Sequence, residues 1–119
     1  MVCLGRTEMR NCDWKEMLLW LIGRRRRFRV TGDSMLPLLA AGDEILLDPH
    51  VYRRRPPRID EVVVARHPEQ IDLQIVKRIV TVRQDGRCHL TGDNPDPTRN
   101  SASVVSPDLI LGQVTSRFY

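Results

Sequence analysis

Ser34 is the first residue of this sequence whose surroundings suggest chemistry. It lies in residues 30–37 (VTGDSMLP), which predict the end of a strand, a tight turn and a short helical start. Gly32 permits a positive φ at the turn, and Pro37 has the φ of a first helical turn. A serine beside free backbone N–H groups has a hydroxyl for attack on a carbonyl and donors for an oxyanion. The commoner alternative is that Ser34 or Asp33 caps a helix.

A nucleophilic serine needs a base, and Lys77 is the candidate. Strand alternation in residues 75–79 (IVKRI) puts Lys77 on the same face as Ile75 and Ile79. An amine desolvated among branched aliphatic side chains has a lowered pKa and can accept a proton. The alternative is a lysine on an edge strand that reaches water. Arg78, on the opposite face, is expected to be structural or to contact substrate.

Other kinds of site find little support in the sequence. The three histidines lack a neighbouring carboxylate or cysteine at ligand spacing, so neither a histidine base nor a metal site is expected. The three cysteines include no C-x-x-C pair, which excludes a zinc pattern and a disulfide framework and favours a reducing, cytoplasmic compartment. We therefore expect no metal and no cofactor.

The net charge of +4 is concentrated in two arginine-rich blocks, residues 24–29 and 53–58. Such blocks attract phosphate, anionic lipid or acidic protein surfaces, although they also solubilise a surface. A basic β-domain that binds nucleic acid is therefore one alternative. The low aromatic content argues against base stacking, and no groove-reading helix is evident, so we expect no nucleic-acid partner.

Residues 1–23 are predicted to form a separate amphipathic helix, ahead of a domain over residues 24–119. Apolar side chains recur at helical spacing on one stripe, and Asn11 or Asp13 could cap the helix while Gly23 ends it. The members of that stripe are Trp14, Met17, Leu18, Leu21 and Ile22. The favoured interpretation is packing on the domain or on a partner, and the alternative is peripheral contact with an anionic membrane. The apolar run over residues 17–22 is too short to cross about 30 Å of hydrocarbon.

After residue 23 the signals are mostly β. Short apolar runs are separated by turn residues, and Asp85-Gly86 is a hairpin signal. The predicted strands cover residues 28–30, 44–48, 61–66, 73–82, 87–90 and 109–117, while residues 51–58 and 92–108 are predicted to be loops. The expected fold class is mainly β, a small antiparallel or partly closed barrel-like sheet with a short N-terminal helix.

Four segments in this order resemble the signal peptidase I family of Ser/Lys proteases. They are GDSMLP at residues 32–37, GDE at 42–44, IVKRI at 75–79 and GDNP at 92–95. The resemblance covers about residues 27–117. It implies the signal peptidase and repressor-protease fold, with Ser34 as nucleophile and Lys77 as general base.

The resemblance also implies roles for the residues around this dyad. The oxyanion and the substrate would be bound by the backbone N–H of Ser34 and by the residues that flank it, which are Thr31, Asp33 and Met35. Asp93, Asn94 and Ser101 would support the dyad, and Ser101 could hydrogen-bond Lys77. The sequence departs from the family at Gly32, where many members carry a hydroxyl, and at Asp60-Glu61, where a Gly-Asp is usual. It departs again at residues 100–102 (NSA), in place of Asp-Ser-Arg.

Within that family the sequence is most similar to the maturation proteases of nickel-type superoxide dismutase. The segments that carry this likeness are residues 31–37, 52–58, 63–68 and 111–118. The implied partner is a precursor protein, the nickel superoxide dismutase proprotein, whose N-terminal leader would be removed. The alternatives are a general signal peptidase-like enzyme at a membrane surface and a self-cleaving repressor domain. A long membrane-spanning amino terminus is not seen, which favours a soluble or peripheral enzyme.

Overall fold

A computed structural model describes residues 11–118 of the chain. The predicted N-terminal unit before Asn11, with Cys3, lies outside the described residues. The strands are β1 (Arg26–Arg29), β2 (Glu44–Asp48), β3 (Val62–Arg66), β4 (Gln74–Val82), β5 (Cys88–Thr91), β6 (Ser103–Val105) and β7 (Ile110–Phe118). The helices are α1 (Trp14–Leu21), the short α2 (Val51–Arg54) and the 3₁₀ turn η2 (Pro107–Leu109).

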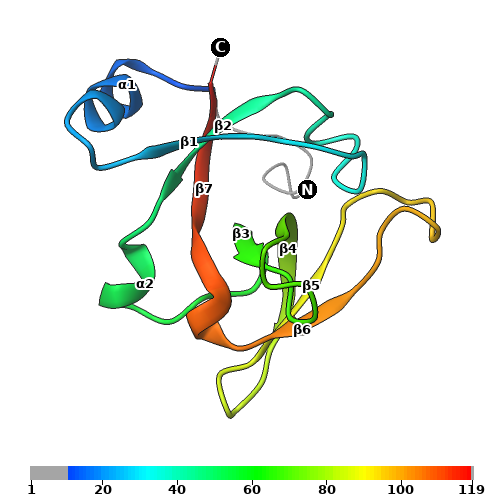
Figure 1. The fold of residues 1–119 in the computed structure, drawn as a ribbon. Helices are drawn as coiled ribbons and strands as arrows, with labels where there is room; N and C mark the ends of the chain where they lie inside the picture. The colour runs from blue at the N-terminus through cyan, green and yellow to red at the C-terminus, as the bar shows by residue number, and fades with distance from the viewer. Residues whose placement is uncertain (1–10, 119) are drawn as a thin grey trace, which may run out of the picture.

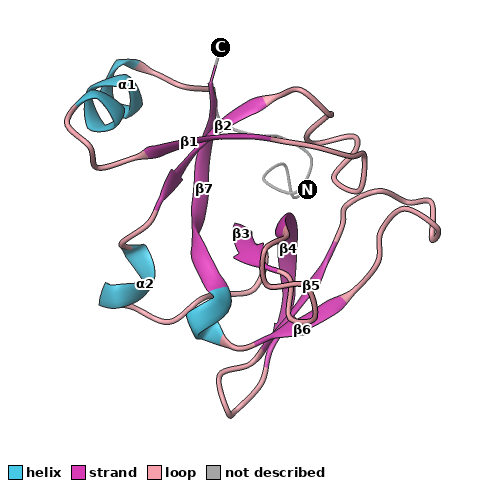
Figure 2. Cartoon of the chain, in the orientation of Figure 1, coloured by secondary structure: helices cyan, strands magenta, loops and turns pink. Residues whose placement is uncertain are grey.

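The seven strands form one sheet in the order β1-β2-β7-β3-β4-β5-β6, and each neighbouring pair is antiparallel. The predicted mainly β, antiparallel fold class is confirmed (Figure 1, Figure 2). The sheet is open, with β1 and β6 at its two edges, and it is strongly curved (Figure 1). Bulges where β7 pairs with β2 and β3 locally change the register.

Two buried clusters pack against this sheet. The first joins the segment after Ser34 to the strands, because Met35, Leu38 and Leu39 are buried with Ile45 and Val64. The second takes the alternate residues of β3 and therefore lies on the other face of that strand. Its buried members are Val63, Ala65, Ile79, Cys88, Leu90, Val105 and Ile110. Burial of each large aliphatic side chain contributes roughly 1.5–3 kcal/mol, so the first cluster holds the Ser34 turn firmly on the sheet.

Three local predictions are wrong. The expected loops contain α2, β6 and η2, elements of only three or four residues, which are too short to carry a periodic pattern. Their stability comes from tertiary contacts, as in α2, where Tyr52 packs on the second cluster and donates a hydrogen bond to Glu61 at 2.9 Å. Residues 34–38 form consecutive turns in place of a helical start, and the Leu36–Pro37 peptide is cis.

α1 begins and ends as expected, but the interpretation that its apolar stripe packs on the domain is wrong. The Asp13 carboxylate accepts a hydrogen bond from the Glu16 backbone N–H at 2.9 Å, and Gly23 follows the helix with a φ of 82°. Trp14, Leu21 and Ile22 are 70%, 69% and 62% exposed. The buried residue of the helix is instead Glu16, because its partners lie on the strands.

Candidate active site

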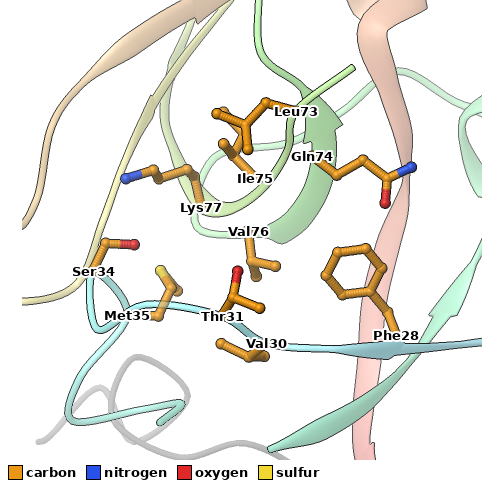
Figure 3. Close-up of a pocket in the computed structure, with 10 residues that line it drawn as sticks. All are labelled: Phe28, Val30, Thr31, Ser34, Met35, Leu73, Gln74, Ile75, Val76 and Lys77. Carbon is orange, nitrogen blue, oxygen red and sulfur yellow. The ribbon is translucent and has the colours of Figure 1, made fainter. Parts of the chain in front are cut away.

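Ser34 and Lys77 line the same pocket, a cavity of about 190 Å³. One wall comes from β1 and the segment that follows it, and the other comes from β4 and the residue before it. The lining residues are Phe28, Val30, Thr31, Ser34 and Met35 on the first wall and Leu73, Gln74, Ile75, Val76 and Lys77 on the second. Figure 3 shows the side chains of Ser34 and Lys77 at one end of the pocket and those of Phe28 and Gln74 at the other.

Lys77 is buried without a carboxylate partner among the described residues. Its exposure is 5%, and it lies opposite Val63 in the β3–β4 ladder. Burial lowers the pKa of Lys77 from its ordinary value of 10.5, because a low-dielectric environment disfavours the charged ammonium. Its Nζ lies 3.5 Å from Ser101 Oγ, at the limit of a hydrogen bond. The Lys77 amine, at the end of the pocket where Ser34 lies, therefore loses its proton more readily than an exposed lysine does.

The backbone around Ser34 is held by the loop that follows β5. The Asn94 backbone N–H donates to the Ser34 carbonyl oxygen at 2.8 Å, and the Asn94 side-chain amide donates to the Asp33 carbonyl oxygen at 2.8 Å. A Cβ atom on Gly92 would overlap the Ser34 carbonyl oxygen, so only glycine allows the loop to approach this closely. Asn94 and Gly92 together fix the backbone from which the Ser34 hydroxyl projects.

Asp93 positions that loop through Arg78. The guanidinium of Arg78 donates from Nε and Nη2 to the two Asp93 carboxylate oxygens, at 2.8 and 2.7 Å, and from Nη1 to the Asp60 carbonyl oxygen at 2.8 Å. Arg78 is 2% exposed. A bidentate pair of this kind fixes both position and orientation. Of the two roles expected for Arg78, its burial and these contacts fit the structural one.

The three residues expected to bind the oxyanion or the substrate differ in their surroundings. Thr31 and Met35 line the pocket, and Met35 is also a buried member of the first core cluster. Asp33 is not among the lining residues, and its carboxylate forms an ion pair with Arg99 at 2.7 Å. The Ser34 backbone N–H has no hydrogen-bond acceptor among the described residues and is thus a candidate oxyanion donor.

Arg99 and Asn100 are two residues of the site that sequence reasoning missed. Arg99 joins the loop to the Ser34 turn, and the Asn100 side-chain amide donates to the Asn94 carbonyl oxygen at 2.7 Å. The Asn100 carbonyl accepts from Thr91 Oγ1 at 3.0 Å. The unusual 100–102 segment is thereby fastened to the rest of the loop. The only feature of the sequence that pointed to these two residues was the position of Arg99, directly before the 100–102 segment that departs from the family pattern.

The pocket also lies between two strand edges that have no neighbour among the described residues. β5 pairs with β4 only from Arg78 onward, so residues 74–77 have a partner on the β3 side alone. β1 pairs only with β2 and is an edge of the sheet. An extended peptide could therefore hydrogen-bond to either edge while its carbonyl groups pass the Ser34 hydroxyl.

Two further observations concern metal binding and membrane spans among the described residues. No group of three or more His, Cys, Asp or Glu side chains within residues 11–118 could hold a metal ion. In the same range, every helix is too short or too polar to cross a bilayer.

Comparison with known families gives one match. The model described as "Signal peptidase, peptidase S26" matches residues 18–89, which is more than half of the chain and includes both Ser34 and Lys77. A search of the curated proteins finds no match.

Proposed function

The chain belongs to the signal peptidase family, peptidase S26, and from this premise we propose that it is a serine endopeptidase with a Ser34–Lys77 dyad. We further propose that it removes the N-terminal leader of a precursor protein. The observation that carries the proposal is the shared pocket, in which a serine hydroxyl and a buried amine lie at the same end. An unactivated serine is a poor nucleophile, and a neutral lysine is a base that needs no further partner.

In this mechanism an extended precursor segment occupies the pocket between β1 and residues 74–77. Ser34 Oγ attacks the scissile carbonyl carbon while Lys77 Nζ takes the hydroxyl proton. The oxyanion is stabilised by the Ser34 backbone N–H. Lys77 then gives its proton to the leaving amine, which yields an acyl-enzyme and the released product. In the second half, Lys77 takes a proton from water as the water oxygen attacks the ester carbon. The bond to Ser34 Oγ then breaks, Lys77 returns the proton to Ser34 Oγ, and the leader leaves with a new carboxyl terminus.

The Ser101 hydroxyl orients the base in this proposal. At 3.5 Å from Lys77 Nζ, it limits the amine to rotamers near the pocket. Asn94 acts on the nucleophile instead, because it hydrogen-bonds the backbone carbonyl oxygens of Asp33 and Ser34. Asp93 holds the same loop through its ion pair with Arg78. Ser101 and Asn94 therefore contact the proposed dyad directly, whereas Asp93 acts through Arg78.

We propose the nickel superoxide dismutase precursor as the substrate. This proposal rests on the similarity of residues 31–37, 52–58, 63–68 and 111–118 to the maturation proteases of that enzyme. Removal of the leader would expose the new amino terminus that binds nickel. The peptidase itself would use no metal.

The test incubates the purified chain with this precursor and reads the new amino terminus by mass spectrometry. Ser34→Ala is expected to lower kcat by on the order of a millionfold, as does removal of other serine nucleophiles. Lys77→Met is expected to lower it by about a hundredfold to ten-thousandfold. The matched control for the serine is Ser106→Ala, because the Ser106 side chain makes no capping hydrogen bond to η2. The matched control for the lysine is Lys15→Met, because Lys15 is the other lysine of the chain.

A second readout separates the chemistry from the substrate. A serine-directed fluorophosphonate should add its mass to wild-type protein at Ser34 and leave Ser34→Ala unmodified. Labelling without cleavage of the precursor would contradict the proposed substrate alone. Cleavage that survives in Ser34→Ala would contradict the dyad. If neither reaction occurs, Asn100→Asp with Ala102→Arg tests whether the 100–102 departure has disabled the site, and continued inactivity would overturn the proposal.

A further inference from the structure

A second, smaller cavity continues the pocket that holds Ser34 and Lys77. This cavity, here called the distal pocket, has a volume of about 60 Å³ and shares Phe28 and Gln74 with the first pocket. Figure 3 shows these two side chains at the end of the first pocket that lies away from the dyad. The other residues that line the distal pocket are Arg26, Arg27, Leu47, Val64 and Leu111. A groove therefore runs from the dyad past Phe28 and Gln74 to two arginines.

Arg26 is the arginine that brings an unpaired charge to the far end of this groove. Strand alternation puts Arg26 on the same face of β1 as Phe28, and Arg26 lies opposite Leu47 in the β1–β2 ladder. Its side chain is exposed and forms no ion pair with any residue in the range 11–118. Arg27, on the other face of β1, pairs with Glu44. The distal pocket thus has one uncompensated guanidinium and no carboxylate among its lining residues.

A carboxylate is the group that fits this end of the groove. The planar guanidinium of an arginine donates in a fork that matches the two oxygens of a carboxylate, and the Gln74 side-chain amide borders the same cavity as a second donor. One water molecule needs roughly 10–15 Å³ of such a cavity, so the end of one acidic side chain has room. An aspartate or glutamate of a bound peptide would therefore find a partner here.

The spacing along the strands sets which residue of a bound peptide reaches Arg26. On β4, Gln74 is three residues from Lys77, and on β1, Arg26 is two residues from Phe28. An extended chain advances about 3.3 Å per residue, so a peptide along these edges passes Gln74 about three residues from its scissile bond and Arg26 about five residues from it. The length of the arginine side chain adds about one residue. This count holds for either direction of the peptide.

We propose that Arg26 is a specificity-determining residue, which binds an aspartate or glutamate side chain five or six residues from the scissile bond of the substrate. The inference rests on the proposed peptidase function and gives that function a preference at a position remote from the bond. Arg26 is not part of the dyad, so its contribution falls on KM, with little change in kcat. The preference also gives the groove a way to select one site in a precursor.

The test uses a mixture of synthetic peptides in which every residue type occurs at every position. The purified chain cleaves the mixture and mass spectrometry identifies the cut bonds, so neither a substrate nor a direction of binding is assumed. Aspartate and glutamate should be enriched about threefold to fivefold at five or six residues from the cut bond, the effect of one exposed ion pair.

Variants of one residue assign this preference. Arg26→Gln should remove the enrichment, Arg26→Lys should keep most of it, and Arg26→Glu should replace it with a preference for lysine or arginine. The matched control is Arg53→Gln, because Arg53 is an exposed arginine that lines neither cavity and has no ion pair in the described part of the chain. Circular dichroism shows that each variant is folded.

A second readout needs no cleavage. The Ser34→Ala protein is titrated with two fluorescein-labelled peptides of twelve residues, in which alanine and valine alternate between the two terminal pairs. Those pairs are glutamate in one peptide and glutamine in the other. Fluorescence anisotropy should show about threefold to fivefold tighter binding of the glutamate peptide, and Arg26→Gln in the same background should abolish the difference.

Two results would overturn the proposal. One is cleavage of the mixture without an acidic preference at these positions, or with a preference that survives in folded Arg26→Gln. The other is a Ser34→Ala protein that does not distinguish the two labelled peptides. If the mixture stays uncut while the glutamate peptide binds more tightly through Arg26, the peptidase function is contradicted and the carboxylate site at Arg26 is supported.

Discussion

Lys77 shows how one residue acquires chemistry from its surroundings. On an exposed strand its ammonium would be hydrated and charged at neutral pH. Here the side chain is 5% exposed between strands rich in valine and isoleucine, and desolvation lowers its pKa. The same burial makes the protonated lysine unfavourable for folding, so the lowered pKa that the proposed base role needs and a stability penalty have one cause.

The first prediction concerns the pH dependence that Lys77 imposes. The folded pKa lies below 10.5 and the unfolded pKa near it, so the unfolded state binds more protons between the two values. The free energy of unfolding should rise with pH across that window, and kcat/KM should rise with pH as Lys77 deprotonates. Lys77→Met should remove this contribution to the slope in thermal melts. A wild-type slope that persists in Lys77→Met would contradict the assignment.

The second prediction concerns Gly92. Gly92→Ala places a methyl group against the Ser34 carbonyl oxygen and Cβ, so the loop or the Ser34 turn must shift. We expect a loss of about 1–3 kcal/mol in the free energy of unfolding, as for overpacking elsewhere, and a large fall in kcat. Denaturant titration and Ser34 labelling measure the two effects. Gly86→Ala, where the nearest side-chain atom is Pro107 Cγ at 3.5 Å, tests a positive-φ turn remote from the site.

At the scale of elements, the loop between β5 and β6 is the part that assembles the site. It contacts the Ser34 turn through Asn94, reaches β4 through Asp93 and approaches Lys77 through Ser101. Arg99 adds an exposed ion pair to Asp33, whose side chains are 56% and 41% exposed. Exposed pairs contribute little to stability, but this one joins the Ser34 turn to the loop that carries Ser101.

The third prediction concerns that pair. Asp33→Arg or Arg99→Asp should each lower kcat several-fold with little effect on KM, because two like charges would push the loop from the turn. The charge-swapped protein, Asp33→Arg with Arg99→Asp, should recover most of the activity. Added salt should reduce the differences in kcat between wild type, the single variants and the swapped protein, since salt screens a solvent-exposed ion pair. A swapped protein no better than the worse single variant would show that the ion pair does not position the site.

At the scale of the whole molecule, Glu16 joins the two ends of the described chain. Its contacts with Thr115 and Ser116 link α1 to β7 across about 100 residues of sequence. β7 itself lies in the middle of the sheet, between β2 and β3. The orientation of α1, and with it the exposed stripe, therefore depends on the completed sheet.

The fourth prediction follows from that link. Glu16→Ala removes the acceptor of the buried Ser116 hydroxyl and one of the two acceptors of the part-buried Thr115 hydroxyl, and a buried group left without a partner costs about 1–3 kcal/mol. We expect a lower melting temperature and a change in tryptophan emission, because both tryptophans lie in the released helix. Lys15→Ala, at the exposed neighbouring position, should leave the melting temperature unchanged. An unchanged melting temperature for Glu16→Ala would mean that α1 is held by other contacts.

The sequence by itself determined the longer strands. The apolar runs that predict residues 44–48 and 73–82 contain the whole of β2 and β4, since a strand buried against a core needs apolar side chains whatever its neighbours are. The cap at Asp13 is equally local, because a carboxylate three residues before a backbone N–H can reach it without any tertiary contact. α2 and β6 were not predicted, because the conformation of an element of three or four residues depends on the residues that pack against it.

Tertiary structure alone decided which residues meet. Asp33 and Arg99 are 66 positions apart, and no local pattern links them until the loop after β5 closes over the Ser34 turn. The stripe of α1 has the spacing of a buried face, yet it lies outward because Glu16 finds its partners on β7. The spacing of apolar residues predicts that a helix has an apolar side. Which side packs against the rest of the domain depends on the total energy of the helix's contacts, and those contacts come from distant parts of the chain.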